Sequence, residues 1–89
     1  MSGGRFDFKQ HYIEDIAYEI EHIIGKNNVK NERGYSYDFS AETIKKLKEA
    51  VITLRRAEAM AQRIDWLVCA DDSEKTFHEQ WDKELRAIK

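Results

Sequence analysis

The chain has 89 residues, the size of one small domain, and its single cysteine, Cys69, excludes an intramolecular disulfide. It lacks proline, 36% of its residues are charged, and its net charge is −2. This composition predicts one soluble all-α domain over residues 1–89 and disfavours a sheet-rich or disordered chain. The near-neutral charge also argues against duplex nucleic-acid binding, which depends on neutralising phosphates.

The first predicted helix follows a glycine-containing start, residues 1–6, that we expect to be flexible. It begins at Asp7, which has Gln10 three positions on as in a capping box, and stops at Gly25. Its apolar residues recur at helical spacing: Tyr12, Ile13, Ile16, Ala17, Ile20, Ile23 and Ile24. Residues 7–24 also carry five acids against one base, Lys9, so this helix is acidic.

Residues 25–39 are rich in Asn, Lys and Gly and predict a solvated loop. Tyr35, Tyr37 and Phe39 alternate at its end. They form either a short extended segment that covers the helices, which we favour, or an aromatic surface for a ligand.

Residues 40–70 contain neither Gly nor Pro and predict one long central helix capped by Ser40. One apolar stripe supplies its core face: Ile44, Leu47, Val51, Leu54, Ala57, Ala61, Ile64, Leu67 and Val68. A second set, Ile52, Ala59 and Trp66, recurs every seven residues on another flank. Two apolar seams require two partners, so we expect this second flank to meet another copy of the chain or to hold a ligand.

A third helix is predicted over residues 74–88, after a break at Asp71 and Asp72. Its apolar stripe is Phe77, Trp81, Leu85 and Ile88. The short second connection makes the last two helices antiparallel neighbours, and the longer loop permits the same for the first two. The predicted fold is therefore a three-helix antiparallel bundle that forms a homo-oligomer through Ile52, Ala59 and Trp66.

Most patterns that could support catalysis or metal binding are incomplete. Glu19 and His22 have the spacing of a di-iron motif, but the second such pair is missing. Three side chains on the third helix share one flank, as is common on solvated helices: Glu74, His78 and Asp82. Cys69 lies in an apolar run that gives a thiolate little support. We therefore expect no enzyme activity, no metal and no cofactor.

Basic and aromatic residues form the remaining candidate binding set. They are Lys48, Arg55, Arg56, Arg63 and Trp66 on the second flank of the long helix, with Arg5, Tyr35 and Tyr37 as additional members. Guanidinium groups bind phosphate and flat rings stack on bases, so the set fits a small anionic nucleotide. The alternative, which we favour, is a basic flank neutralised by the acidic first helix or by a partner chain.

Most of the chain resembles small α-helical proteins of unknown role encoded by phages and prophages, and three segments carry this resemblance most clearly. They are Arg5-Phe6-Asp7-Phe8, Arg63-Ile64-Asp65-Trp66-Leu67, and Asp71-Asp72 before Phe77-His78. The resemblance implies an inhibitor of host defence that acts in the cytoplasm of the host cell. The incomplete catalytic patterns and the short apolar runs predict that this protein is non-enzymatic and has no membrane partner. Two mechanisms follow: binding of a host defence protein, or an oligomeric sponge that sequesters a nucleotide immune signal.

Overall fold

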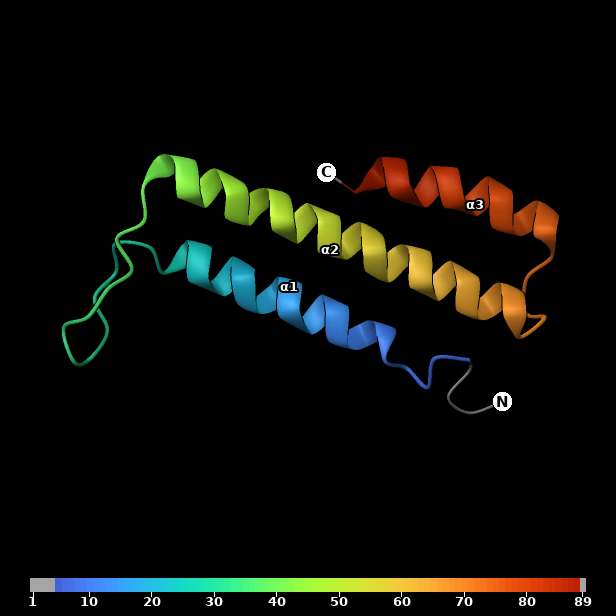
Figure 1. Ribbon diagram of the computed structural model, residues 1–89, viewed down its shortest axis with the longest axis horizontal. Helices are drawn as coiled ribbons and strands as arrows, with labels where there is room; N and C mark the ends of the chain where they lie inside the picture. The colour runs from blue at the N-terminus through green and yellow to red at the C-terminus, as the bar shows by residue number, and fades with distance from the viewer. Residues whose placement is uncertain (1–4, 89) are drawn as a thin grey trace.

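The computed structural model describes residues 5–88 and confirms that the chain is all-helical. Its three helices are α1 Gln10–Gly25, α2 Ala41–Val68 and α3 Glu74–Ala87 (Figure 1). In this part of the chain there is no strand, and Asn27 and Tyr37 form an isolated β-bridge. The expectation of a flexible N-terminus falls mainly on residues 1–4, which lie outside the described residues.

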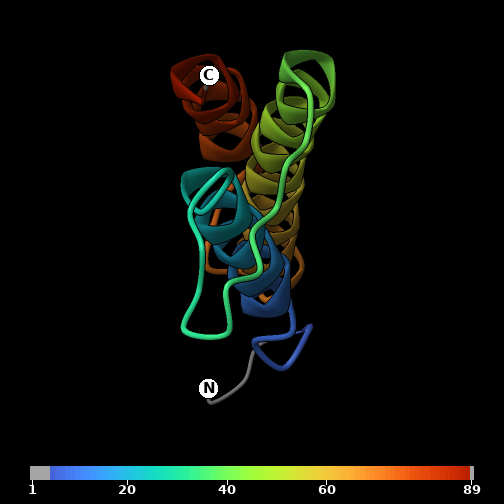
Figure 2. The ribbon, with the colours of Figure 1, turned by 90° about the vertical axis from the view of Figure 1, so that its left-hand side faces the viewer.

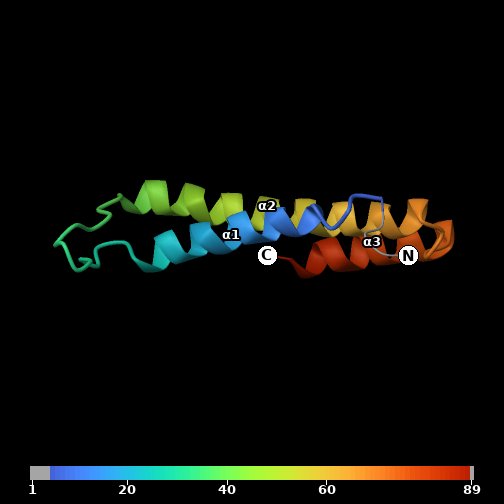
Figure 3. The same ribbon diagram turned by 90° about the horizontal axis from the view of Figure 1, so that it is seen from below.

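The two shorter helices both pack against α2. Figure 1 shows the chain reversing direction at each connection, and the end-on view of Figure 2 places α1 and α3 on neighbouring faces of α2. α3 covers only the C-terminal half of α2 and ends at the level where α1 begins (Figures 1 and 3). The three helices therefore lie side by side only near the middle of α2.

The resulting molecule is long and thin, with extents of 52 × 27 × 12 Å. Its radius of gyration is 16.9 Å, whereas a compact domain of this length has a radius of about 12 Å. Ala17 and Val51 are the buried apolar residues among those described, so the core is small. Many apolar side chains consequently remain open to solvent.

Serine caps begin the second and third helices, and the predicted cap at Ser40 is confirmed. Ser40 accepts a hydrogen bond from the Thr43 N–H at 3.2 Å, and Ser73 accepts one from the Thr76 N–H at 3.1 Å. Each serine satisfies a backbone donor that the helix itself cannot pair.

The prediction that Asp7 caps the first helix is wrong. The residue before α1 is Lys9, in helical conformation and without a side-chain cap. Asp7 and Phe8 instead have left-handed φ values of 52° and 62°, and the Lys9 N–H donates to the Phe6 carbonyl. The chain thus enters α1 through a tight turn, and Gln10 turns inward rather than completing a capping box.

Two asparagines order the loop between α1 and α2. Asn27 both donates to the Phe39 carbonyl and accepts from the Phe39 N–H, at 3.2 and 2.9 Å. Asn31 Oδ1 accepts from the Arg33 and Tyr35 N–H groups. The favoured covering role for the loop aromatics is not observed, because all three are exposed: Tyr35, Tyr37 and Phe39.

The second flank of α2 faces α3 over its C-terminal half. Arg56 and Arg63, which lie on this flank, both contact the end or the body of α3. Ala59 and Trp66 share this flank by helical spacing, and Trp66 is 38% exposed, whereas Ile52 lines a groove with Glu21 of α1. Part of this flank is therefore occupied within the subunit by contacts of its arginines with α3.

Candidate functional site

The adjacent arginines of α2 point to different helices. Arg55 forms an ion pair with Glu21 of α1. Arg56 Nη2 donates to the Ile88 carbonyl at the end of α3, at 3.3 Å. The two guanidinium groups thus bind separate parts of the subunit instead of forming one anion site.

Arg63 is buried between α2 and α3. Its Nη1 lies 3.3 Å from Asp72 Oδ2 and its Nε lies 3.6 Å from Glu84 Oε1, while the guanidinium carbon lies 4.2 Å from the centroid of the Trp66 ring. A buried charge needs such compensation, and removing a partner from it is costly. Arg63 therefore holds the α2–α3 connection together, with Trp66 beside it.

The other members of the predicted binding set lie apart. Lys48 lies next to Ile52 and Arg55, in a shallow groove on the N-terminal half of α2. Tyr35 and Tyr37 line a hollow at the loop end of the molecule. Arg5 is exposed and precedes the start of α1, at the end of that helix opposite the loop. The structure does not bring these residues together with Arg63 and Trp66 in one site.

Asp65 forms a polar centre between the N-terminal segment and α2. Its carboxylate accepts from the Arg5 N–H at 2.6 Å, from Gln10 Nε2 at 3.2 Å and from Cys69 Sγ at 3.4 Å. The Arg5 N–H is the main reason that the pKa of Asp65 is lowered. Gln10 also donates to Gln62 Oε1 at 2.9 Å, so this centre fixes the start of α1 against α2.

Cys69 is poorly suited to act as a nucleophile. Burial raises the pKa of its thiol, and the hydrogen bond to Asp65 and the charge of that carboxylate raise it further. Thiolate is the reactive form of cysteine, and this environment disfavours it. The thiol instead serves as a weak donor to Asp65.

The outward side of α1 carries an apolar stripe with two exposed members. We call it the α1 outer stripe and define it as Tyr12, Ile16 and Ile23. Tyr12 is 67% exposed and Ile16 is 51% exposed, while Ile23 is half-buried. Their spacing of four and seven residues places them on one side of the helix, next to Asp15 and Glu19.

Helical spacing in the sequence could have distinguished the residues of the outer stripe from the buried residues of the first helix. The predicted apolar set of the first helix contains three adjacent pairs, and neighbouring helical positions differ by 100°. The pairs are Tyr12 and Ile13, Ile16 and Ala17, and Ile23 and Ile24. In the first two pairs the second member is the less exposed one: Ala17 is completely buried and Ile13 is half-buried, whereas Tyr12 and Ile16 are exposed. Ile23 and Ile24 are both half-buried.

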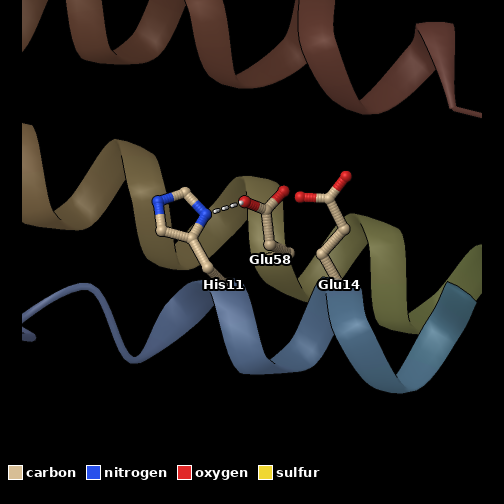
Figure 4. A group of neighbouring side chains, drawn as sticks. All are labelled: His11, Glu14 and Glu58. Atoms are coloured by element: carbon tan, nitrogen blue, oxygen red, sulfur yellow. Dashed lines mark ion pairs between the residues drawn. The ribbon is translucent and has the colours of Figure 1, made fainter.

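A mixed group of metal-ligating side chains lies between α1 and α2. It consists of His11, Glu14 and Glu58, and Figure 4 shows Glu58 standing between the other two. The ligand atoms lie within 4.8 Å of one another, and His11 Nδ1 is 3.5 Å from Glu58 Oε2. The spacing of His11 and Glu14 is visible in the sequence, but the approach of Glu58 depends on helix packing.

Comparisons of the chain with protein-family models, with curated proteins and with solved structures find no match. Among the described helices, none combines the length and the apolar character that crossing a membrane requires.

Proposed function

We propose that this chain is a non-enzymatic binding protein that docks on a partner protein through the α1 outer stripe. The observation that carries the proposal is the exposure of Tyr12 and Ile16 on one side of a regular helix. An amphipathic helix normally buries such residues, and exposed aromatic and aliphatic side chains in a row are typical of protein interfaces.

The charge of α1 indicates the chemistry of the partner. The helix contains Glu14, Asp15, Glu19 and Glu21 and no Lys or Arg. Asp15 and Glu19 border the outer stripe, so a complementary surface is apolar at its centre and basic at its rim. Pairing of this face with a second copy of itself would oppose like charges, which favours a different protein as the partner.

The surface area of the subunit supports an interface of ordinary size. The accessible surface is 6962 Å², compared with roughly 5,400 Å² for a compact monomer of this mass. The excess exceeds the ~800 Å² that each partner contributes to a standard protein interface. A partner could therefore cover the outer stripe and still leave the rest of the molecule solvated.

The resemblance to phage proteins makes a host defence protein the expected partner, which the chain would inhibit by covering part of its surface. The nucleotide sponge is the weaker alternative. Its central residues Arg55, Arg56 and Arg63 are engaged within the subunit. A nucleotide would have to displace Asp72 and Glu84 from Arg63 before that guanidinium could bind phosphate.

The proposal is tested by native mass spectrometry of the tagged chain purified from defence-competent bacterial cells. The wild type is compared with the double variant Tyr12→Ser, Ile16→Ser. We expect a stoichiometric complex with one host polypeptide for the wild type and loss of most of that complex for the variant. Both substituted side chains are exposed, so the helical circular-dichroism spectrum is expected to be preserved.

The matched control is Tyr35→Ser, which removes an equally exposed aromatic side chain from the loop. We expect this variant to retain the complex. A host complex that survives the double variant, or a wild-type chain that carries a nucleotide and no polypeptide, would contradict the proposal.

A further inference from the structure

We propose that His11, Glu14 and Glu58 form a site for a divalent transition-metal ion of the zinc type, which would join α1 to α2. The three residues supply one imidazole nitrogen and two carboxylates. This is a common combination for zinc, iron and manganese, and it leaves coordination positions open to water. The imidazole distinguishes the group from an ordinary acidic patch.

The geometry fits one ion. Ligand bonds of about 2.1 Å in a tetrahedral site place neighbouring ligand atoms about 3.4 Å apart. His11 Nδ1 and Glu58 Oε2 are 3.5 Å apart, which is long for a hydrogen bond and close to this ligand spacing. Glu14 is exposed, so rotation of its side chain can bring its carboxylate within reach. The Phe8 ring lies beside the His11 ring and nearly parallel to it, at 6.2 Å between centroids.

The negative charge of the two carboxylates also favours the binding of a cation. Among the described residues, neither Glu14 nor Glu58 forms an ion pair with a Lys or Arg, and the pairing of Glu58 with His11 depends on the protonation of the ring. Glu14 on α1 and Glu84 on α3 lie near enough to Glu58 to act on its charge, as does His11. All three helices therefore contribute to the charge around this point.

The site differs from the metal patterns visible in the sequence. In the described part of the chain, neither the pair Glu19 and His22 nor the triple on α3 assembles three ligand atoms closely enough. Because the proposed site draws on α1 and α2, a bound ion would stabilise their packing, and its effect is measurable as a gain in stability.

The test is isothermal titration of the full chain with ZnCl2 in a non-chelating buffer, together with thermal unfolding in the presence and absence of ZnCl2. We expect one ion per chain and a higher unfolding temperature. His11→Ala and Glu58→Gln are each expected to weaken zinc binding at least about tenfold and to remove the thermal shift. MgCl2 is expected to give no comparable shift, because Mg²⁺ prefers oxygen ligands.

Glu58→Gln also distinguishes the loss of a metal ligand from a loss of folding, which could both weaken zinc binding. The substitution removes a carboxylate that faces two others, so the metal-free variant is expected to be at least as stable as the wild type. His78→Ala is the matched control, since it removes an exposed histidine on α3 and is expected to keep the zinc response. The proposal is overturned by the absence of a zinc response, by a response that His11→Ala leaves intact, or by one that His78→Ala abolishes.

Discussion

At the scale of single residues, Asp65 joins the N-terminal segment to the long helix. It is buried, and its carboxylate accepts from Arg5, Gln10 and Cys69. An asparagine in its place would turn an amide donor toward one of these donors and leave it unpaired. The start of α1, which carries the outer stripe, would then be held less firmly against α2.

Asp65→Asn is therefore expected to lower the unfolding temperature at pH 7. The pKa of Asp65 is lower in the folded state than in the unfolded state. The ionised carboxylate therefore stabilises the fold at pH values above the unfolded pKa of about 3.9, and this stabilisation is lost as the pH falls through the folded pKa. Thermal unfolding from pH 7 to pH 3 checks this, because the difference between variant and wild type shrinks below about pH 4. The control Asp82→Asn, at an exposed position, is expected to unfold at the same temperature as the wild type. If the unfolding temperature of Asp65→Asn stays as far below that of the wild type at pH 3 as at pH 7, the charge of Asp65 is not the cause.

At the scale of the elements, local signals in the sequence located the helices well. The cap at Ser40, the break before α3 and the long uninterrupted segment of α2 all depend on residues close together in the chain. The start of α1 was predicted incorrectly because it depends on a contact between Arg5 and Asp65, sixty positions apart. A capping pattern at Asp7 contains no information about such a contact.

The cap of the long helix gives a prediction at the same scale. Ser40→Ala removes the acceptor for the Thr43 N–H and is expected to lower the free energy of unfolding by about 1 kcal/mol. Urea unfolding followed by circular dichroism measures this loss. Ser36→Ala, in the exposed loop, is expected to cost less, and equal losses for the two variants would show that the cap contributes nothing specific.

At the scale of the whole molecule, the positions of the arginines were the least predictable feature. The sequence places Arg55, Arg56 and Arg63 near one flank of α2, and that proximity suggested a shared anion site. Their actual partners depend on the faces of α2 that α1 and α3 occupy, which helical periodicity alone does not determine. The same packing brings Glu58 between His11 and Glu14, and it leaves two members of the outer stripe exposed.

Hydroxyl-radical footprinting of the chain, free and in complex with the polypeptide that co-purifies with it, tests the binding proposal most directly. We expect Tyr12 and Ile16 to lose most of their reactivity in the complex, while the equally exposed Tyr35 keeps its reactivity. This result would place the partner on the outer side of α1. Unchanged reactivity of Tyr12 and Ile16, with protection at Tyr35, Tyr37 or Trp66 instead, would contradict the account.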